Sequence, residues 1–444
     1  MKRIVLSVCA AVAAVIVARA ETYTWTGGSG DWATLESWQV GEAQGSATRL
    51  PGLDDDVVIP SGDTDYTVYT TVSIAVKSLG IGAIDGTAAG KATFESHTLA
   101  TNRVSGSLHV YKNGRMTHAA HEKKVNTPKY KLNFEVGADM TIDASGEVNV
   151  DTKGYYSMCG QGQSASGVWY AGCPSGSTST ALIYGSIGEP TDLGSGGHSN
   201  GYGESTKSGG GAVYLDVAGT LTVNGVVTAC GNSTFNGNGG CGGAGGSILL
   251  ACGTLAGGGI VRADHATADI YDKYSPSYSG GGGRVSLIQR EAKDWSAFTG
   301  KVWARGGKNS TCGSAGTVYR LCAGSPYGEV RVDNVYDSTD RSNGSYATLP
   351  STNPDTKEVT RGFALTIGGG GKVKITQNWT IYDLSFFNNK ATLALGTNTL
   401  TLISREHKDG KGWPSGITIT SNQTPNGVWG KIVWKKPGFA LIVR

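Results

Sequence analysis

A glycine-led phrase with alternating apolar positions recurs through the middle of the chain. Its copies read GGAVYL, GGSILL, GGRVSL and, more weakly, AGTVYR, at residues 210–215, 245–250, 282–287 and 315–320. The branched apolar residues of successive copies are 35, 37 and 33 residues apart, at Val213, Ile248, Val285 and Val318. Alternation of apolar with small polar residues is typical of a half-buried strand. A nearly constant step of this size predicts stacked repeat units rather than one globular core.

A second phrase follows the first in three of these units. It reads GVVTA, GIVRA and GKVWA, at residues 225–229, 259–263 and 300–304. Between the two phrases, Leu221 and Val223 predict a short middle strand in one unit, and Leu255 predicts it in the next. Three strands per unit, repeated in one sense, predict an all-β parallel β-helix of stacked three-strand coils with small β caps at its ends. The crossover preference of parallel strands predicts a right-handed coil.

The first twenty residues predict a secretory signal peptide. Lys2 and Arg3 precede an apolar run over residues 4–17, and the run ends at the small-x-small motif of residues 18–20. Cleavage near Ala20 implies a secreted mature chain, extracellular or at the outer cell surface. The run is too short to span a membrane, and no other segment approaches about eighteen apolar residues, so we expect no transmembrane segment.

The mature chain divides into three predicted regions. They are a Trp-rich N-terminal cap module at 21–71, the parallel β-helix at 72–330, and a C-terminal β region of continuing coils and a cap at 331–444. Residues 152–209 are rich in Gly, Ser and Tyr and contain few apolar runs. We expect this insertion to be an extended loop that lies over one side of the stack.

Composition excludes some partners. The formal charge of +3 falls to zero when Lys2, Arg3 and Arg19 leave with the signal peptide. A neutral chain gives no reason to expect nucleic acid or an anionic membrane as a partner. Glycine, with 69 residues, is about twice as frequent as average. The recurring alternation of Val, Ile and Leu nevertheless argues against a disordered glycine-rich chain.

Seven cysteines remain after cleavage, an odd number for an oxidising compartment. Equivalent positions around two strand anchors predict two bridges, and a third would close its own loop: Cys241–Cys252, Cys312–Cys322 and Cys159–Cys173. Cys230 would then remain as a single thiol. The alternative is that strand cysteines such as Cys252 are small buried hydrophobic residues.

Several segments resemble one broad group of known proteins. The segments are TYTWTGGSGDWATLESW at 22–38, LPGLDDDVVIPSG at 50–62, and GGAGGSILLACGTLAGGGIVRADH at 242–265. They resemble the entry module and the coils of secreted bacterial parallel β-helix surface proteins of the autotransporter-adhesin type. The resemblance implies the fold and secretion, and it also supports the right-handed coil. It does not extend to a translocation barrel, since no run of amphipathic ten-residue strands is found in the last part of the chain.

Candidate ligand sites of other kinds have simpler explanations. The glycine runs near residues 237–246 and 280–283 lack the following helix or Lys-Ser/Thr pair of a phosphate cradle. We interpret them as tight corners at which glycine adopts positive φ. Residues 54–56 are three aspartates, which favour a solvated turn over a calcium site, and we expect no cofactor. His118 and His121 have a spacing that suits a shared metal on a helical turn, but a surface loop is the favoured interpretation.

The basic segment around these histidines is a candidate contact for an acidic glycan. Its lysines and arginine are Lys112, Arg115, Lys123, Lys124, Lys129 and Lys131. A solvated edge is the favoured interpretation of this segment. Exposed aromatic residues in the two long loops are the other candidates for glycan or protein contact, namely Trp169, Tyr170, Tyr271, Tyr274 and Tyr278, together with Tyr155 and Tyr156 in the first loop. Packing against the stack is the alternative for the first-loop aromatics.

An enzymatic alternative depends on carboxylates and cations near one loop. Some secreted β-helices cleave acidic polysaccharides, and others hydrolyse glycosides with paired carboxylates. The nearest candidates are Asp264, His265, Asp269, Asp272, Lys273 and Arg284, of which Asp264 and Arg284 lie at repeat positions. Asp264, however, aligns with Cys230 and Arg305 in the repeat, which predicts an outward, variable position. The sequence therefore favours a secreted or cell-surface structural and adhesive protein without catalysis, whose projecting loops contact a glycan or a surface protein. A polysaccharide lyase or glycoside hydrolase is the first alternative, and a passive coat or matrix component is the second.

Overall fold

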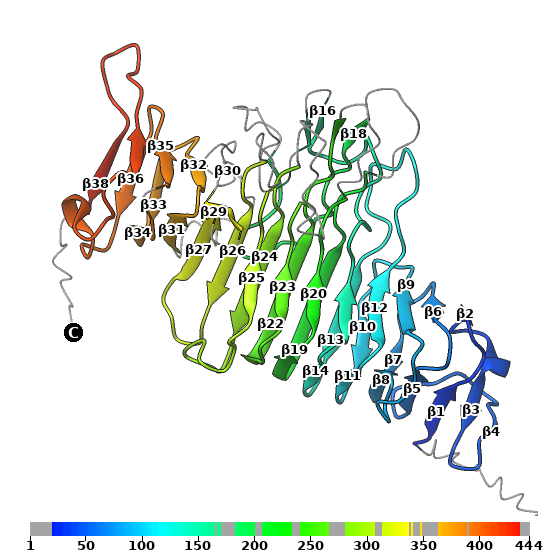
Figure 1. The fold of residues 1–444 in the computed structure, drawn as a ribbon. Coiled ribbons are helices and arrows are strands. Elements are labelled where there is room, and N and C mark those ends of the chain that lie inside the picture. The colour runs from blue at the N-terminus through cyan, green and yellow to red at the C-terminus, as the bar shows by residue number, and fades with distance from the viewer. Residues whose placement is uncertain are drawn as a thin grey trace, which may run out of the picture.

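The computed structural model describes residues 20–164, 167–168, 170, 183–199, 207–232, 240–265, 280–306, 313–336, 339–340, 347–348, 363–388 and 390–435. These residues form β-strands and two short 3₁₀ helices, η1 (Leu35–Ser37) and η2 (Lys408–Gly410), with no α-helix among them. Figure 1 shows the strands side by side along an elongated molecule. The predicted all-β class with parallel sheets is confirmed.

Three parallel ladders make up the N-terminal three quarters of the chain. Ladder 1 contains β7 (Ala75–Val76), β10 (Asn102–Val104), β13 (Leu132–Val136), the first half of β19 (Ala212–Val223), the first half of β22 (Ser247–Ala256), β24 (Arg284–Gln289) and β26 (Thr317–Leu321). Ladder 2 contains β5 (Asp56–Pro60), β8 (Ser78–Gly82), β11 (Leu108–Val110), β14 (Met140–Ile142) and the second halves of β19 and β22. Both ladders belong to a 17-stranded sheet.

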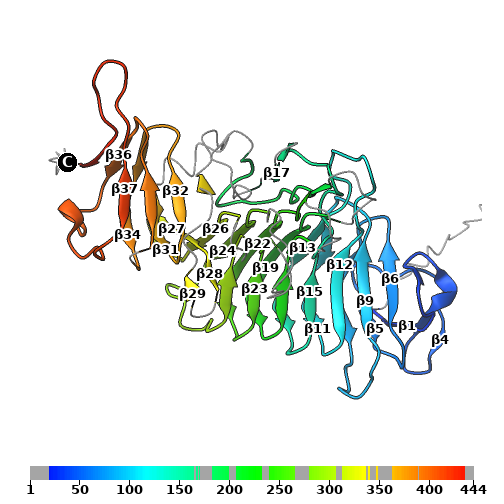
Figure 2. The same cartoon turned by 45° about the horizontal axis from the view of Figure 1, so that its top comes forward.

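Ladder 3 is a separate 8-stranded sheet. It contains β2 (Gly30–Asp31), β6 (Tyr66–Thr70), β9 (Ala92–Ser96), β12 (Gly114–His118), β15 (Glu147–Asn149), β20 (Val226–Thr228), β23 (Ile260–Arg262) and β25 (Lys301–Trp303). Its inward side chains share one apolar core with those of ladders 1 and 2. Figure 2 shows these strands from a second direction. Among the described residues, three antiparallel pairs form separate two-stranded sheets: β16 (Gln163–Ser164) with β17 (Gly167–Val168), β18 (His198–Ser199) with β21 (Gly240–Cys241), and β28 (Val335–Tyr336) with β29 (Thr339–Asp340).

The strand register reproduces the sequence repeat. The four branched anchors of the first phrase are successive Cα partners along ladder 1: Val213, Ile248, Val285 and Val318. The second phrase aligns in the same way along ladder 3, where Val227 pairs with Val261 and Val261 with Val302. The predicted middle strand is part of β19, in which the register shifts between Val217 and Thr220. The alignment made from sequence is therefore confirmed residue by residue.

The glycines of the first phrase are explained by close approach, not by positive φ. None of Gly210, Gly245 and Gly282 has a φ between +20° and +160°, so the expectation of left-handed corners is wrong for Gly245 and Gly282. A Cβ atom at these positions would lie 2.0, 2.2 and 2.2 Å from three carbonyl oxygens, those of Ala229, Ala263 and Ala304. Those alanines end the second phrase. The two phrases therefore meet at one corner, where no side chain fits.

The N-terminal module is held by an aromatic cluster. β1 (Thr22–Trp25), β3 (Trp38–Val40) and β4 (Gly45–Ser46) pair in antiparallel fashion. The Trp25 and Trp32 rings contact Trp38 edge to face, with centroids 5.0 and 4.7 Å away. Trp32 also contacts Phe94 of ladder 3, at 6.1 Å, which joins the module to the main core. Because β5 and β6 already pair in parallel with β8 and β9, the ladders begin upstream of residue 72.

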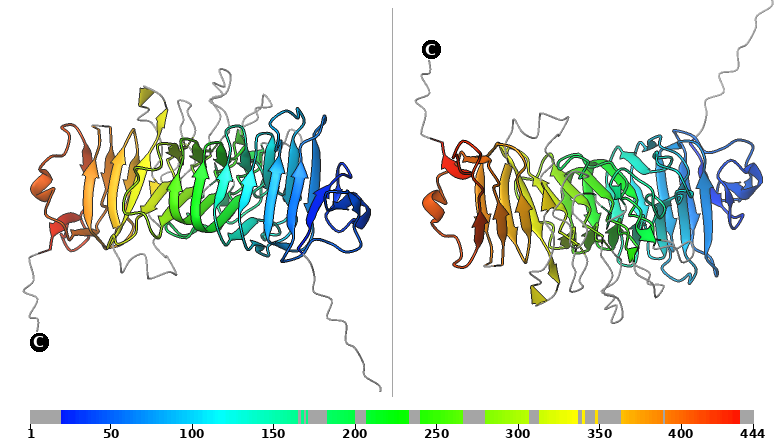
Figure 3. Two further views of the ribbon diagram at one scale, coloured as in Figure 1. Left: turned by 90° about the horizontal axis from the view of Figure 1, so that it is seen from below. Right: turned by 90° about the horizontal axis from the view of Figure 1, so that it is seen from above.

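The C-terminal region is a second parallel stack with its own core. Its strands are β27 (Gly328–Asp333), β31 (Phe363–Gly368) and β34 (Asp383–Phe386) in the large sheet, then β30 (Ala347–Thr348), β32 (Lys372–Lys374), β35 (Thr392–Ala394) and β37 (Thr418–Thr420), and β33 (Trp379–Ile381), β36 (Thr399–Leu402) and β38 (Lys431–Trp434). The side chains that they bury form a separate apolar cluster. Figure 3 shows this stack at one end of the long axis.

The two stacks join through one antiparallel pair of strands. The core lies on one face of the sheet before this pair and on the opposite face after it. β26 and β27 run in opposite directions, with Tyr319 opposite Val330. Val318 points into the first core, whereas Val330 and the partly buried Tyr319 belong to the second. Strand direction and core side therefore reverse together at this junction.

Candidate functional site

Of the first-loop aromatic candidates that the structure describes, Tyr170 and Tyr155 are buried, whereas Tyr156 is half-buried. Tyr170 is completely buried, its hydroxyl is hydrogen-bonded to the Ser247 hydroxyl, and the Arg284 guanidinium lies 5.5 Å from its ring centroid. The expectation that the Tyr170 and Tyr155 rings face solvent is corrected, since they pack against the strands of ladder 1. Four further candidates, Trp169, Tyr271, Tyr274 and Tyr278, lie outside the described residues.

The described part of the 152–209 insertion lies across the outer face of ladder 1. The Arg284 guanidinium donates to the carbonyl oxygen of Tyr184 at 2.9 Å and to the Thr317 hydroxyl at 3.1 Å. Ser286 donates its hydroxyl to the carbonyl oxygen of Gly188 at 2.6 Å. Ser247 donates to the carbonyl oxygen of Asp192 at 2.5 Å. Polar residues that face outward on successive strands are thereby satisfied and covered.

The two candidate lyase residues at repeat positions belong to different networks. Asp264 is buried, and its Oδ2 accepts from the Arg305 guanidinium at 2.6 Å, while Oδ1 accepts from the Arg305 backbone N–H at the same distance. The predicted outward, variable position is therefore wrong, because the corner of the coil buries it. The Arg284 guanidinium instead donates to the carbonyl oxygen of Tyr184, in the insertion that covers ladder 1. The geometry does not bring Asp264 and Arg284 together. Three of the other candidates lie outside the described residues, namely Asp269, Asp272 and Lys273.

His118 and His121 are buried, so the favoured surface-loop interpretation is wrong. The Nε2 atom of His118 accepts from the Ala212 backbone N–H at 3.2 Å, and its Nδ1 contacts the carbonyl oxygen of Ala119 at 2.9 Å. The Nε2 atom of His121 accepts from the Lys129 N–H at 2.9 Å. A metal would need these nitrogen lone pairs, which already accept backbone protons. Burial lowers the pKa of His118 to about 3.

The aspartates at 54–56 offer little to calcium. Asp55 is buried and accepts from the Arg49 guanidinium at 2.9 Å and from the Gly52 N–H at 2.7 Å. Asp56 accepts from Lys77 at 2.9 Å and from the Ser78 hydroxyl at 2.5 Å. These carboxylate oxygens stabilise the entry to β5. Among the described residues, no group of three or more His, Cys, Asp or Glu could hold a metal ion.

The disulfide predictions remain predictions. Cys159, Cys230 and Cys252 are buried free thiols, and Cys322 is a half-buried one. Because the side chains of the three proposed partners, Cys173, Cys241 and Cys312, lie outside the described residues, the free state holds only among the residues that the structure describes. Burial raises the pKa of Cys252 to about 12, as expected for a cysteine that packs as a hydrophobic residue.

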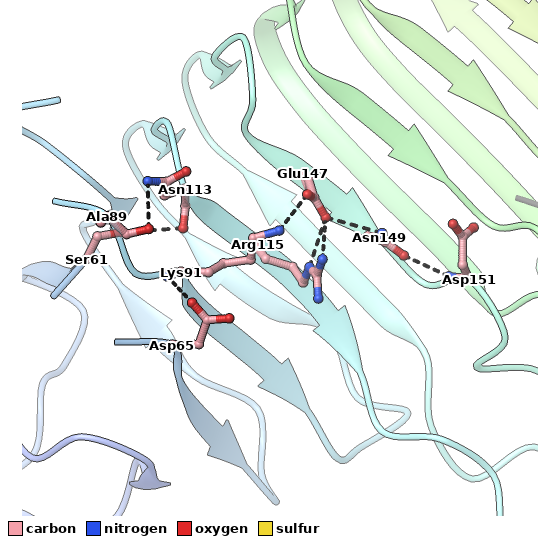
Figure 4. Close-up of polar contacts among 9 residues, drawn as sticks. All are labelled: Ser61, Asp65, Ala89, Lys91, Asn113, Arg115, Glu147, Asn149 and Asp151. Carbon is pink, nitrogen blue, oxygen red and sulfur yellow. Dashed lines mark hydrogen bonds and ion pairs between the residues drawn. The ribbon is translucent and has the colours of Figure 1, made fainter. Parts of the chain in front are cut away.

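A charged network on the outer face of ladder 3 is the most developed polar surface among the described residues (Figure 4). Glu147 accepts from Lys91 Nζ at 2.7 Å, from Arg115 Nη2 at 2.8 Å and from Asn149 Nδ2 at 3.2 Å. Burial raises the pKa of the Glu147 carboxyl, but the hydrogen bonds from Lys91 and Arg115 outweigh it and hold the pKa below its usual value. Asp65 accepts from the Lys91 backbone N–H at 2.7 Å. Glu147 therefore stays ionised and fixes both cations.

A second charged group lies beside the first, at the edge of the same face. Glu95 is hydrogen-bonded to His97 Nε2 at 2.6 Å, and it accepts from Lys153 Nζ at 3.2 Å. Burial raises the pKa of the Glu95 carboxyl, but these partners outweigh it and leave the pKa lowered. Glu95 pairs in register with Thr117 of β12, two residues along the strand from Arg115. The two groups thus form one surface.

A column of aromatic and histidine rings follows the corner next to this surface. The Tyr69 and His97 rings are stacked, with centroids 5.0 Å apart, and Tyr130 follows His97 at 5.8 Å. The column continues from Tyr130 to His121 at 5.4 Å and to Tyr155 at 5.8 Å. Its first three rings are half-exposed, whereas His121 and Tyr155 are buried. The open end of the column lies next to Glu95 and Lys153.

Sequence reasoning found part of this surface and missed its organisation. Arg115, Lys129 and Lys131 were recognised as a basic segment, but Lys91, Glu147 and Lys153 were not connected with it. The signal that could have found them is the ladder register, because Thr93 pairs with Arg115 and Arg115 with Glu147. The upstream repeats lack the glycine phrase that would have revealed this register.

Comparison with known proteins identifies no relative. No family model matches the chain, and neither a curated protein nor a solved structure matches it. In the described part, no helix is long and apolar enough to cross a membrane.

Proposed function

We propose that the chain is a secreted, right-handed parallel β-helix with a structural and adhesive role, and that it contacts its partners without catalysis. The simultaneous reversal of strand direction and core side at β26 and β27 supports a single hand. Reversing both leaves the sense of winding about the long axis unchanged. One continuous coil of this kind is a stiff rod, which suits a role in holding contact surfaces at fixed spacing.

The observation that best supports this proposal is that the glycine-rich insertions all leave the stack at the same position in the coil. Each begins after a ladder 3 strand and ends before a ladder 1 strand, in the intervals β15 to β19, β20 to β22, β23 to β24 and β25 to β26. Because those strands are in register, the residues that flank the insertions lie at one corner of the stack. Repeated insertion at one corner is the pattern of a binding side on a repeat protein.

The alternative of a polysaccharide lyase or glycoside hydrolase finds less support. Such enzymes need carboxylates or cations that are free to reach the scissile bond. Asp264 is locked to Arg305, and Arg284 is covered by the insertion. Glu147 and Glu95 each accept from two basic partners, which leaves neither positioned as a general acid or base. A passive coat component, the second alternative, would self-associate without binding other molecules.

The proposal is tested by screening the mature chain against a glycan array and against whole cells, together with a product assay. We expect saturable binding and no turnover. Absorbance from unsaturated sugars, or new reducing ends, would establish the enzymatic alternative instead. Absence of binding together with self-association would establish the passive one.

A further inference from the structure

We propose that the outer face of ladder 3, with the open end of the ring column, binds an acidic polysaccharide, that is, a sugar chain that carries carboxylate or sulfate groups. This inference rests on the proposed adhesive function and adds the site and the class of ligand. The binding surface consists of Lys91, Arg115, Lys153, Tyr69, His97 and Tyr130. It lies on a sheet face rather than in a projecting loop.

The cations of this surface keep hydrogen-bond donors beyond those used on the protein. Lys91 and Lys153 each direct one ammonium N–H at a glutamate, and an ammonium group has three. Arg115 directs its Nε and one Nη2 hydrogen at Glu147, out of five N–H groups. Charge-assisted hydrogen bonds to carboxylate or sulfate oxygens are the strongest use of such donors.

The cationic side chains of this surface are more exposed than the glutamates with which they pair. Side-chain exposure is 35% for Arg115, 25% for Lys91 and 26% for Lys153, against 23% for Glu147 and 21% for Glu95. The carboxylate oxygens of Glu147 and Glu95 already accept hydrogen bonds from basic side chains, and they hold the cations in place. A ligand that approaches this face therefore meets oriented N–H donors, and little of their orientational entropy remains to be lost on binding.

The surroundings add net positive charge. Lys91, Arg115 and Lys153 lie among four carboxylates, those of Glu95, Glu147, Asp65 and Asp151. The segment 122–131, next to the ring column, adds four lysines and one glutamate. Its contact with the column is direct, because Tyr130 packs on both His97 and His121. The surface as a whole thus favours an anion over a neutral sugar.

The ring column offers groups that fit sugar hydroxyls. In the described part of the chain, no protein group is hydrogen-bonded to the hydroxyl of Tyr69 or of Tyr130. Tyr69, His97, His121 and Tyr155 come from four successive coils, so rings recur at this corner at the ladder spacing of about 4.8 Å. A glycan that lies along the ladder can therefore meet cations on one side and ring edges on the other.

The experiment is titration calorimetry of the mature chain with polygalacturonate, chondroitin sulfate and dextran. We expect binding of one or both acidic chains, weakened at least about tenfold between roughly 50 and 500 mM NaCl, and no binding of dextran. The carboxylated and the sulfated chain are compared to identify which acid group is preferred. Absence of binding to both acidic chains, or equal binding of dextran, would overturn the inference.

Paired variants test the location. Lys91→Gln with Lys153→Gln leaves Glu147 paired with Arg115 and Glu95 bonded to His97, so the fold should be retained, and we expect about tenfold weaker binding. The matched control, Lys77→Gln with Arg290→Gln, removes two cations from surface ion pairs elsewhere and should change affinity less than about twofold. Equal loss in the two double variants would refute the site.

Hydroxyl removal tests the ring column separately. Tyr69→Phe with Tyr130→Phe keeps the rings and should weaken binding about threefold to fivefold. Tyr111→Phe, in the stacked His109–Tyr111 pair on another face, is the control and should have no effect. Binding that persists unchanged in all variants would remove this site but leave the adhesive function standing, whereas turnover of the glycan would remove that function.

Discussion

Replacement of Gly246 by alanine tests the corner at which the two sequence phrases meet. The added Cβ would lie 1.9 Å from the carbonyl oxygen of Gly211, where real Cβ contacts stay beyond 3.0 Å. The neighbouring atom belongs to the backbone, so it cannot rotate away. Two strands would have to separate by more than 1 Å in a ladder whose spacing is about 4.8 Å.

The cost follows from the hydrogen bonds at this corner. The Gly246 N–H donates to Ala229 at 2.8 Å, the Ser247 N–H to Gly211 at 3.0 Å, and the Gly246 carbonyl accepts from Arg284 at 2.9 Å. Loss of these three bonds at about 1 kcal/mol each, with about 1–3 kcal/mol of overpacking, predicts a decrease of about 4–6 kcal/mol in the free energy of unfolding.

Urea denaturation followed by far-ultraviolet circular dichroism measures the effect. Gly62→Ala is the control, since a Cβ there meets nothing within 4 Å and the φ is not positive. We expect that variant to remain within about 1 kcal/mol of the wild type. If Gly246→Ala unfolds at the same urea concentration as Gly62→Ala, the close-approach explanation is wrong.

Three further predictions concern buried groups. Burial lowers the pKa of His118 to about 3 and that of His265 to about 4, so these histidines bind protons more readily in the unfolded chain than in the folded one. As the pH falls from 7 to 5, each histidine should therefore lower the free energy of unfolding by about 2 kcal/mol. Equal melting temperatures at the two pH values would contradict this prediction. Asp264→Asn should cost about 3–5 kcal/mol in urea by removing the buried carboxylate that pairs with the Arg305 guanidinium, whereas Asp264→Leu with Arg305→Met should recover part of it, because the backbone N–H of residue 305 still loses its acceptor. Alkylation of the denatured, unreduced mature chain should label one cysteine, Cys230, if the three bridges form, and intact mass showing seven labels would exclude all of them.

The periodic part of the fold could be predicted because each repeat imposes the same local requirement. A branched residue such as Val285 must point inward at every level, and the glycine two residues before it must leave room for a carbonyl of the previous level. Both requirements leave a fixed signature at a fixed step. The junction at β26 and β27 left no such signature, because one antiparallel pair needs no special residue.

The candidate site could not be predicted because its residues are related by the ladders rather than by the chain. Lys91 and Glu147 are brought together by two intermediate strand pairings, and any shift of register would separate them. Burial was misjudged for the same reason. His118 and Asp264 look like surface residues in a polar segment, but the turn between ladders carries both beneath covering backbone.

The corner glycines are needed for folding, whereas the charged side chains on the ladder 3 face are available for ligand contact, and this difference determines which residues can change when the ligand changes. At the corner, a single methyl group would collide with backbone, so substitution there acts on folding. On the outer face, the Arg115 and Lys153 side chains pair with the half-buried carboxylates of Glu147 and Glu95, and their replacement leaves the ladder hydrogen bonds intact. Stability and ligand preference are therefore set by different residues of the same repeat. Exchange of Lys91, Arg115 and Lys153 for neutral residues, together with Glu95→Gln and Glu147→Gln, should abolish binding of acidic polysaccharide while the urea midpoint shifts by less than the Gly246→Ala variant shifts it. A comparable loss of stability would mean that the charged network is part of the scaffold, and the ladder 3 face would then not be free to vary with the ligand.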